Sequence, residues 1–125
     1  MARLVADAVL DAALNYIKNN GVTMTACSTQ PTTYAEATST YKLADVTIDS
    51  ADYTGPADHT SGRKLTVNAQ TGITVDSSGT YGHVAICSSD TLLYVTTGTS
   101  QVLTAGNTVD FPAWVISIAD PTAPA

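Results

Sequence analysis

The residue types best suited to covalent or metal chemistry are few in this chain: two cysteines, Cys27 and Cys87, and two histidines, His59 and His83. A cysteine nucleophile needs a base within hydrogen-bond reach. His83 and Cys87 are four residues apart in a strand-like segment, so they would lie about 13 Å apart on one face. Zinc sites use closely spaced ligands, whereas these side chains are scattered. The sequence therefore predicts no catalytic residue, no metal site and no cofactor.

Carboxylates gather in one part of the sequence, at Asp45, Asp49, Asp52 and Asp58. Acidic loops can hold calcium through several oxygens, but this spacing does not match the Asp-x-Asp-x-Asp-Gly loop with its closing Glu. A solvated loop is therefore favoured over the alternative of a calcium site. Glu36 is the only glutamate, and no aromatic-lined cleft is evident, so a glycosidase-type pair of carboxylates is not indicated.

One short basic motif, Gly62-Arg63-Lys64, could suggest phosphate binding. A phosphate-binding loop follows a strand and precedes a helix. Here a strand follows instead, so the phosphate reading is rejected. Two interpretations remain open: Arg63 and Lys64 contact an acidic partner, or they are exposed charges at the start of a strand.

The charge balance argues against nucleic acid as a partner. The formal net charge is −6, and only five residues are basic. Phosphate backbones are bound by clustered Lys and Arg, which this sequence lacks. No apolar stretch approaches the roughly 20 residues that cross a bilayer, so no membrane association is predicted.

The thiols are expected to be free. Asp7 and Asp11 interrupt the first apolar run, so we find no secretory signal and expect a protein made in a cytosol. Cysteines in that compartment stay reduced. The alternative is a disulfide between Cys27 and Cys87.

A helix is predicted over residues 2–19. Its apolar residues share one arc, and its charged and amide residues occupy the opposite arc. We expect the apolar arc to pack on the protein's own sheet; the alternative is that the helix supplies part of an interface with a partner. Gly21 or Asn20 supplies a left-handed cap at the end of the helix. The apolar arc holds Val5, Val9, Leu10, Ala13, Leu14, Tyr16 and Ile17, and the polar arc holds Arg3, Asp7, Asp11, Asn15 and Lys18.

The rest of the chain alternates with a period of two, which is typical of strands with one buried face. The last strand is the clearest: Trp114, Ile116 and Ile118 are predicted core residues, and Val115 and Ser117 point away. Pro112 cannot donate to a ladder, so this strand should be bent or bulged there. Strands are expected at 22–26, 41–48, 64–67, 73–75, 84–86, 92–95 and 109–118, with a short helical turn as one reading of 34–37. Residues 49–61 are the longest loop, and 70–72 form a turn.

Recurring short strands separated by small polar turns favour a sandwich or barrel. Charged residues make up only 13% of the chain, and Thr, which suits strands, is abundant. We therefore predict one mainly β domain over residues 1–125, an antiparallel β-sandwich of which a jelly roll is one form. An N-terminal α-helix precedes the β-body at 22–119, and a loose tail follows at 120–125.

Several segments resemble small structural proteins of tailed bacteriophages. They are DAVLDAALNYI, ACSTQPTTYAEA, GRKLTV, GTYGHVAI, TLLYV and GNTVDFPAW, and together they span roughly residues 7–121. The resemblance implies a non-enzymatic virion protein that decorates and stabilises a capsid. It also implies a location on the capsid surface after synthesis in the host cytoplasm.

The partner implied by this resemblance is the shell of the major capsid protein, and a homo-oligomer is a further expectation. The runner-up function is a receptor- or carbohydrate-binding module of a phage tail or bacterial surface. That function predicts a groove with exposed aromatic side chains.

Overall fold

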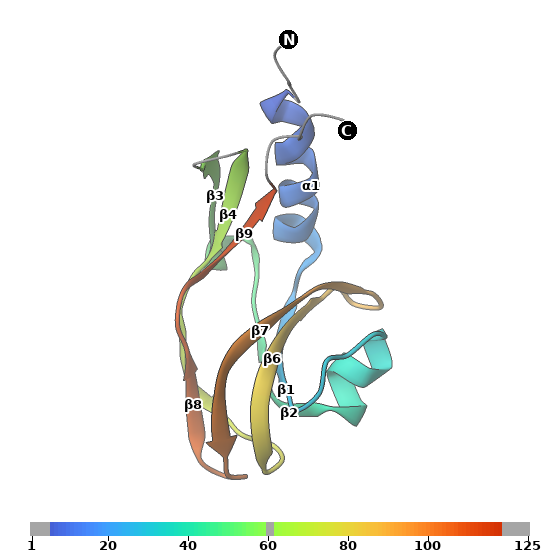
Figure 1. Ribbon diagram of the computed structural model, residues 1–125, viewed down its shortest axis with the longest axis vertical. Helices are drawn as coiled ribbons and strands as arrows, with labels where there is room; N and C mark the ends of the chain where they lie inside the picture. The colour runs from blue at the N-terminus through green and yellow to red at the C-terminus, as the bar shows by residue number, and fades with distance from the viewer. Residues whose placement is uncertain (1–5, 60–61, 119–125) are drawn as a thin grey trace, which may run out of the picture.

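The computed structural model describes residues 6–59 and 62–118, and in this part the chain is mainly β with one long N-terminal helix (Figure 1). The helix is α1 (Asp7–Asn20). The strands are β1 (Thr23–Cys27), β2 (Lys42–Thr47), β3 (Tyr53–Asp58), β4 (Arg63–Val67), β5 (Gln70–Thr74), β6 (Gly79–Cys87), β7 (Leu92–Leu103), β8 (Thr108–Phe111) and β9 (Trp114–Ile118). The predicted helix start at residues 2–5 and the predicted tail at 120–125 lie outside the described residues.

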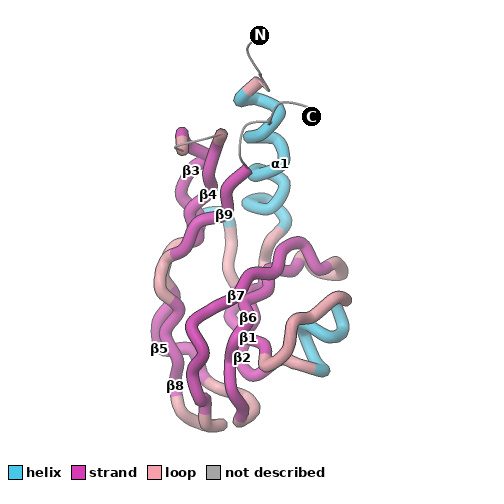
Figure 2. The backbone as a smooth tube through the Cα atoms, in the orientation of Figure 1, coloured by secondary structure: helices cyan, strands magenta, loops and turns pink. Residues whose placement is uncertain are grey.

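The strands form three antiparallel sheets, in the orders β2-β1-β6-β7, β3-β4-β9 and β5-β8. An isolated bridge between Ala44 and Val75 connects the first sheet to the segment after β5. The curved β6–β7 hairpin and the β5–β8 pair face each other across the lower part of the molecule (Figure 2). The predicted class, a sandwich-like antiparallel fold with an N-terminal helix, is confirmed.

Two of these sheets share one long ribbon. Val67 of β4 pairs with Trp114 of β9, and Gln70 of β5 pairs with Phe111 of β8, so the register continues across the gap between them. The ribbon bends where Pro112, which has no N–H, interrupts the ladder. The segment 109–118, predicted as one strand, is therefore two strands joined at a bend.

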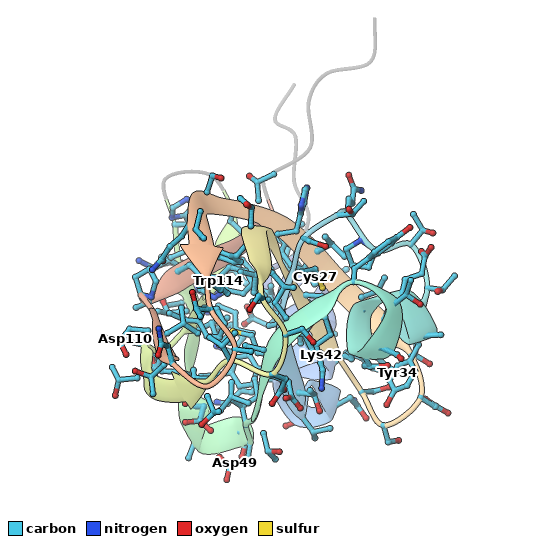
Figure 3. All side chains as sticks on the ribbon, turned by 90° about the horizontal axis from the view of Figure 1, so that it is seen from below. Cys27, Tyr34, Lys42, Asp49, Asp110 and Trp114 are labelled. Atoms are coloured by element: carbon cyan, nitrogen blue, oxygen red, sulfur yellow. The ribbon has the colours of Figure 1, made fainter. Side chains whose placement is uncertain are left out.

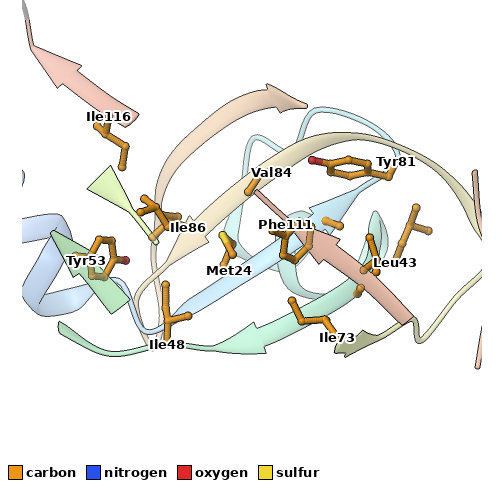
Figure 4. Close-up of a cluster of buried hydrophobic side chains, with 14 of the residues drawn as sticks. Met24, Leu43, Ile48, Tyr53, Ile73, Tyr81, Val84, Ile86, Phe111 and Ile116 are labelled. Atoms are coloured by element: carbon orange, nitrogen blue, oxygen red, sulfur yellow. The ribbon is translucent and has the colours of Figure 1, made fainter. Parts of the chain in front are cut away.

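The main core lies between the sheets and beneath α1 (Figure 4). The last strand alternates as predicted: Ile116 is 2% exposed, whereas Val115 is 42% exposed. Trp114 and Ile118 are partly buried against the same core. The fully buried side chains include Leu14, Met24, Leu65, Val67, Val75, Ile86 and Phe111.

The orientation of α1 agrees with the prediction only in part. Leu10 and Leu14 are buried, but Val9, Ala13 and Tyr16, which were predicted on the buried arc, are exposed. The reason lies outside the helix, because the side that carries Asp7 and Asp11 is drawn toward Arg63 on β4.

Gly21 ends α1 without a left-handed conformation, since its φ is −76°. A side chain is excluded there by close approach instead. A Cβ on Gly21 would lie 2.5 Å from the Tyr53 hydroxyl and 2.7 Å from the Ile17 carbonyl oxygen. The predicted left-handed cap is therefore wrong for both candidates, since neither Gly21 nor Asn20 has a positive φ.

The segment between β1 and β2 covers the outer face of the first sheet. It is helical from residue 34 and contains a π-helical turn, Glu36–Thr40, so the predicted helical turn at 34–37 begins where predicted and extends three residues further. Ala37 in this turn packs with Ala85 and Cys87 of β6 in a second, smaller buried cluster.

Two predicted irregular segments contain strands. Residues 49–61 include β3, which is an edge strand and therefore tolerates Gly55 and Pro56 at an irregularity in its register. Residues 70–72 lie within β5, where the register also shifts. Gly72 has a φ of +67° at that shift, which explains why the sequence resembles a turn.

Candidate functional site

Arg63 is partly buried and paired with carboxylates of the protein's own α1 and β3. Its Nε donates to Asp11 Oδ1 at 2.8 Å, and its Nη1 donates to Asp58. Asp7 lies 3.9 Å away. The hydrogen bonds that Arg63 donates to Asp11 and, to a smaller extent, to Asp58 raise the pKa of Arg63, so the guanidinium is charged at any ordinary pH. This cluster ties β4 to α1 and to the end of β3.

Lys64, the neighbouring predicted contact, is placed differently. It alternates to the other face of β4, where Thr66 lies beside it and Ser117 and Val115 of β9 lie opposite. We call this surface the outer face of the β3-β4-β9 sheet. Lys64 has no carboxylate or hydrogen-bond partner within residues 6–59 and 62–118.

The other two described lysines are engaged. The Lys18 ammonium donates to the Gly55 carbonyl at 2.9 Å. Lys42 lies 3.4 Å from Asp45 and 3.3 Å from Asp76. Burial alone would lower the pKa of Lys42, but the two carboxylates raise it. Among the lysines that the structure describes, Lys64 is therefore the one whose charge can contact a partner.

The aspartates predicted in one acidic loop do not converge. Asp49 and Asp52 cap the 3-10 turn Ser50–Asp52: the Asp52 carboxylate accepts from the Asp49 N–H and the Asp49 carboxylate accepts from the Ala51 N–H, each at 2.9 Å. Asp45 faces Lys42 and Asp58 faces Arg63. Across the described residues, no group of His, Cys, Asp or Glu side chains has a geometry suited to a metal ion.

The structure brings one cysteine and one histidine together that sequence reasoning did not pair. The β1–β6 register sets His83 directly opposite Cys27. Cys27 is fully buried, its Sγ lies 3.6 Å from the Ala37 carbonyl, and burial raises its pKa. A protonated, buried thiol is a poor nucleophile. Only the pairing of distant strands could have revealed this neighbourhood.

Cys27 and Cys87 are both free thiols in the structure. Cys87 pairs with Thr23 across the β1–β6 ladder, four residues from Cys27, so the two cysteines are separated by roughly 13 Å along β1. A disulfide needs Cα atoms within about 7 Å. Burial raises the pKa of Cys87 to about 11, and the charge of Cys27 adds to the shift.

A hollow of about 320 Å³ lies between β7 and the β8–β9 bend. β7 and β8 are edge strands of their sheets, so the hollow separates two unpaired strand edges. Its lining includes Tyr81, Trp114, Gln101 and Asp110, and no Lys or Arg. Trp114 and Asp110 lie on the side of the molecule away from Tyr34 (Figure 3). This lining combines aromatic surface with hydrogen-bonding side chains.

Three features describe the packing and polarity of the side chains that line the hollow. The Tyr81 hydroxyl lies so close over Gly98 that a Cβ there would overlap it. Asp110 accepts a hydrogen bond from the Gly72 N–H at 2.8 Å, which orients its carboxylate. Trp114 Nε1 is buried and has no hydrogen-bond partner in the described part of the chain.

The outward side of α1 is the last surface with a distinctive composition. Its exposed apolar residues are Ala8, Val9, Ala12, Ala13 and Tyr16, and the polar Asn19 is exposed on the same side near the end of the helix. We call the five apolar residues the outward face of α1. α1 lies beside the β3-β4-β9 sheet at the end of the molecule remote from β8 (Figure 1). The outward face is therefore far from the hollow.

Comparisons of the chain with known protein families, with curated protein sequences and with solved structures found no match. Among the described residues, no helix is both long enough and apolar enough to cross a membrane.

Proposed function

We propose that this chain is a non-enzymatic virion structural protein that decorates and stabilises a bacteriophage capsid. The observation that carries the proposal is the outer face of the β3-β4-β9 sheet. There Lys64, whose charge is not neutralised within the described residues, lies among Thr66, Val115 and Ser117. The resemblance of several segments to phage structural proteins supplies the phage context.

The shape and chemistry of this face suit contact with a protein shell. Apart from Lys64 the side chains on this face are short, so they project little from the sheet. The hydroxyl groups of Thr66 and Ser117 can form hydrogen bonds with backbone or side-chain groups of a neighbour. In a chain of net charge −6, the single cation favours an acidic or neutral spot on the partner. Contacts of modest strength suffice, because a lattice presents composite sites shared by neighbouring subunits.

The experiment is co-sedimentation of the purified protein with empty, undecorated shells of its own phage. We expect the protein to pellet with shells and to bind the separate capsid subunit poorly. Val115→Glu and Lys64→Glu should each reduce shell binding at least tenfold. Val102→Glu is the matched control, because Val102 is 75% exposed on β7 in another sheet.

Two results would contradict this proposal. One is a protein that stays in the supernatant with shells present. The other is equal binding by the Val115→Glu and Val102→Glu variants, which would place the contact elsewhere. Moderate salt should weaken binding only slightly, because most of the contact is uncharged.

A second candidate function is supported by the hollow: binding of a neutral saccharide of a receptor or cell surface. Aromatic rings and convergent hydrogen-bonding groups are the usual chemistry of small-ligand sites. Tyr81 and Trp114 provide apolar surface, and Asp110 and Gln101 provide acceptors and donors for hydroxyl groups. The absence of Lys and Arg from the lining favours a neutral ligand over an anionic one.

This candidate has its own test, because Trp114 is the only tryptophan of the chain and its fluorescence reports on the hollow. Purified host surface polysaccharide should shift its emission if the hollow binds saccharide. Gln101→Ala and Asp110→Asn should abolish the shift; Asp110→Asn keeps the oxygen that accepts from Gly72. An unchanged spectrum at saturating polysaccharide would eliminate this function.

A further inference from the structure

The outward face of α1 departs from the usual arrangement of a surface helix, because it is apolar although Leu10 and Leu14 already face the core. Val9 is 61% exposed and Tyr16 is 60% exposed. Ala12 and Ala13 lie between them on the same side and are exposed as well. A surface helix normally turns its polar residues outward and its apolar stripe toward the core. Clustered exposed apolar residues of this kind mark a contact surface.

The charged residues of α1 are all engaged on the side turned toward the body. The Asp11 carboxylate lies 2.8 Å from Arg63, and that of Asp7 lies 3.9 Å from it. The Lys18 ammonium bonds to the Gly55 carbonyl. The outward face therefore carries no charge, whereas the whole chain has a net charge of −6. Two copies of an acidic protein repel one another least where such an uncharged face meets its own equivalent.

The spacing on this face is self-complementary. In an antiparallel pair of helices with a two-fold axis between positions 12 and 13, residue 9 of one copy meets residue 16 of the other. The large side chains, Val9 and Tyr16, are about 10.5 Å apart along the helix, with the small Ala12 and Ala13 at the axis. Small residues at the centre allow close approach of the helices, and the large ones pack at both ends.

We propose that a second copy of this chain covers the outward face of α1, in an antiparallel two-fold dimer that pairs Val9 with Tyr16 and Ala12 with Ala13. The interface is small, because α1 is about 21 Å long. Stable complexes usually bury more than about 1,200 Å². The dimer is therefore weak and reversible, and it does not depend on the presence of a shell.

The first test is sedimentation equilibrium of the full chain up to about 1 mM, the range in which weak complexes form. We expect the apparent mass to rise from monomer to dimer with concentration. Ala12→Glu places two carboxylates near the axis and should weaken association at least tenfold. Val102→Glu adds the same charge on β7 and should dimerise like the unmodified protein.

The second test distinguishes the antiparallel arrangement from others. Proteins carrying Val9→Cys and Tyr16→Cys are mixed and oxidised gently; the two native thiols are buried and do not compete. We expect the mixed 9–16 disulfide to form faster than the 9–9 or 16–16 disulfides. Circular dichroism and melting curves verify that each variant is folded.

A protein that remains monomeric up to about 1 mM would overturn the proposal. So would an Ala12→Glu variant that is folded and dimerises normally, or a preference for the 9–9 and 16–16 disulfides.

Discussion

Arg63 of β4 and Asp11 of α1 lie 2.8 Å apart although 52 residues separate them in the sequence. This contact sets the rotation of α1 about its own axis. It draws the charged side of the helix toward the sheet and leaves Val9 and Tyr16 outside. The same contact occupies the guanidinium that the sequence offered as a partner anchor, and leaves that role to Lys64.

Substitution of Arg63 should therefore lower stability, whereas substitution of its neighbour Lys64 should not. Arg63→Met leaves the carboxylates of Asp11 and Asp58 without their partner, so we expect a clearly lower melting temperature. Lys64→Met removes a cation with no described partner and should leave the melting temperature unchanged within about 2 °C, as surface changes of up to about 0.5 kcal/mol do. Thermal unfolding of the two variants decides between them; equal melting temperatures would contradict the role of Arg63.

Tyr53 should make stability fall at alkaline pH. Its hydroxyl donates to the Gly21 carbonyl at 2.9 Å, and burial, with a smaller effect of Asp52, raises its pKa to about 12. In the unfolded chain the Tyr53 hydroxyl has a pKa near 10, so between pH 10 and 12 this proton is lost mainly from the unfolded state. The free energy of unfolding should fall by about 2 kcal/mol across that window.

Urea unfolding of Tyr53→Phe measures this effect. The variant should lose about 1 kcal/mol at pH 7, from the missing hydrogen bond, and should lack that part of the alkaline decline. Tyr16→Phe, which changes an exposed tyrosine, serves as the control. Parallel alkaline profiles for Tyr53→Phe and the unmodified protein would show that Tyr53 is not responsible.

Gly98 of β7 and Gly82, which follows Tyr81 in β6, provide a matched pair for the packing of Tyr81. A Cβ at Gly98 would overlap the Tyr81 ring and hydroxyl, whereas a Cβ at Gly82 would meet no atom within 4 Å. Gly98→Ala should cost about 1–3 kcal/mol, the usual range for overpacking. Gly82→Ala should change stability by less than about 0.5 kcal/mol. Similar values for the two variants would mean that Tyr81 is not packed over Gly98.

The two thiols should be unreactive in the folded protein. Both side chains are fully buried, and burial raises both pKa values, that of Cys87 to about 11. A thiol reagent at pH 8 should therefore label them at least ~100-fold more slowly in buffer than in denaturant, because the thiolate is the reacting form. Rapid labelling of the native protein, or a mass two hydrogens lower with a linked peptide pair, would contradict this.

The strand pattern was the part of this fold that the sequence could predict. Alternation along Trp114–Ile118 depends only on which side chains avoid water, and it gave the buried face of β9 correctly. The bend at Pro112 follows from a missing N–H, which is also a local property. β3 was missed because Gly55 and Pro56 are typical of loops, and only its position at a sheet edge allows them there.

The candidate surfaces depend on contacts that the sequence pattern does not contain. The helical periodicity of α1 indicated Leu10 and Leu14 as buried. It could not reveal the exact rotation of the helix, because that depends on Arg63 in a distant strand. The hollow needs β7 and the β8–β9 bend side by side, and the Cys27–His83 neighbourhood needs the β1–β6 register. The sequence indicated Arg63 and Lys64 alike as partner contacts. Which of the two side chains faces α1 depends on how β4 is placed against the helix, and the sequence pattern does not show that.

The central claim, that this chain decorates a capsid, is tested most directly by its copy number in purified particles of the phage that encodes it. Quantitative mass spectrometry against labelled peptides gives the ratio of this chain to the major capsid subunit. A decoration protein occupies equivalent sites on the shell lattice. We therefore expect a simple whole-number ratio of this chain to capsid subunits, close to one to one. A handful of copies per particle, or none, would contradict the account.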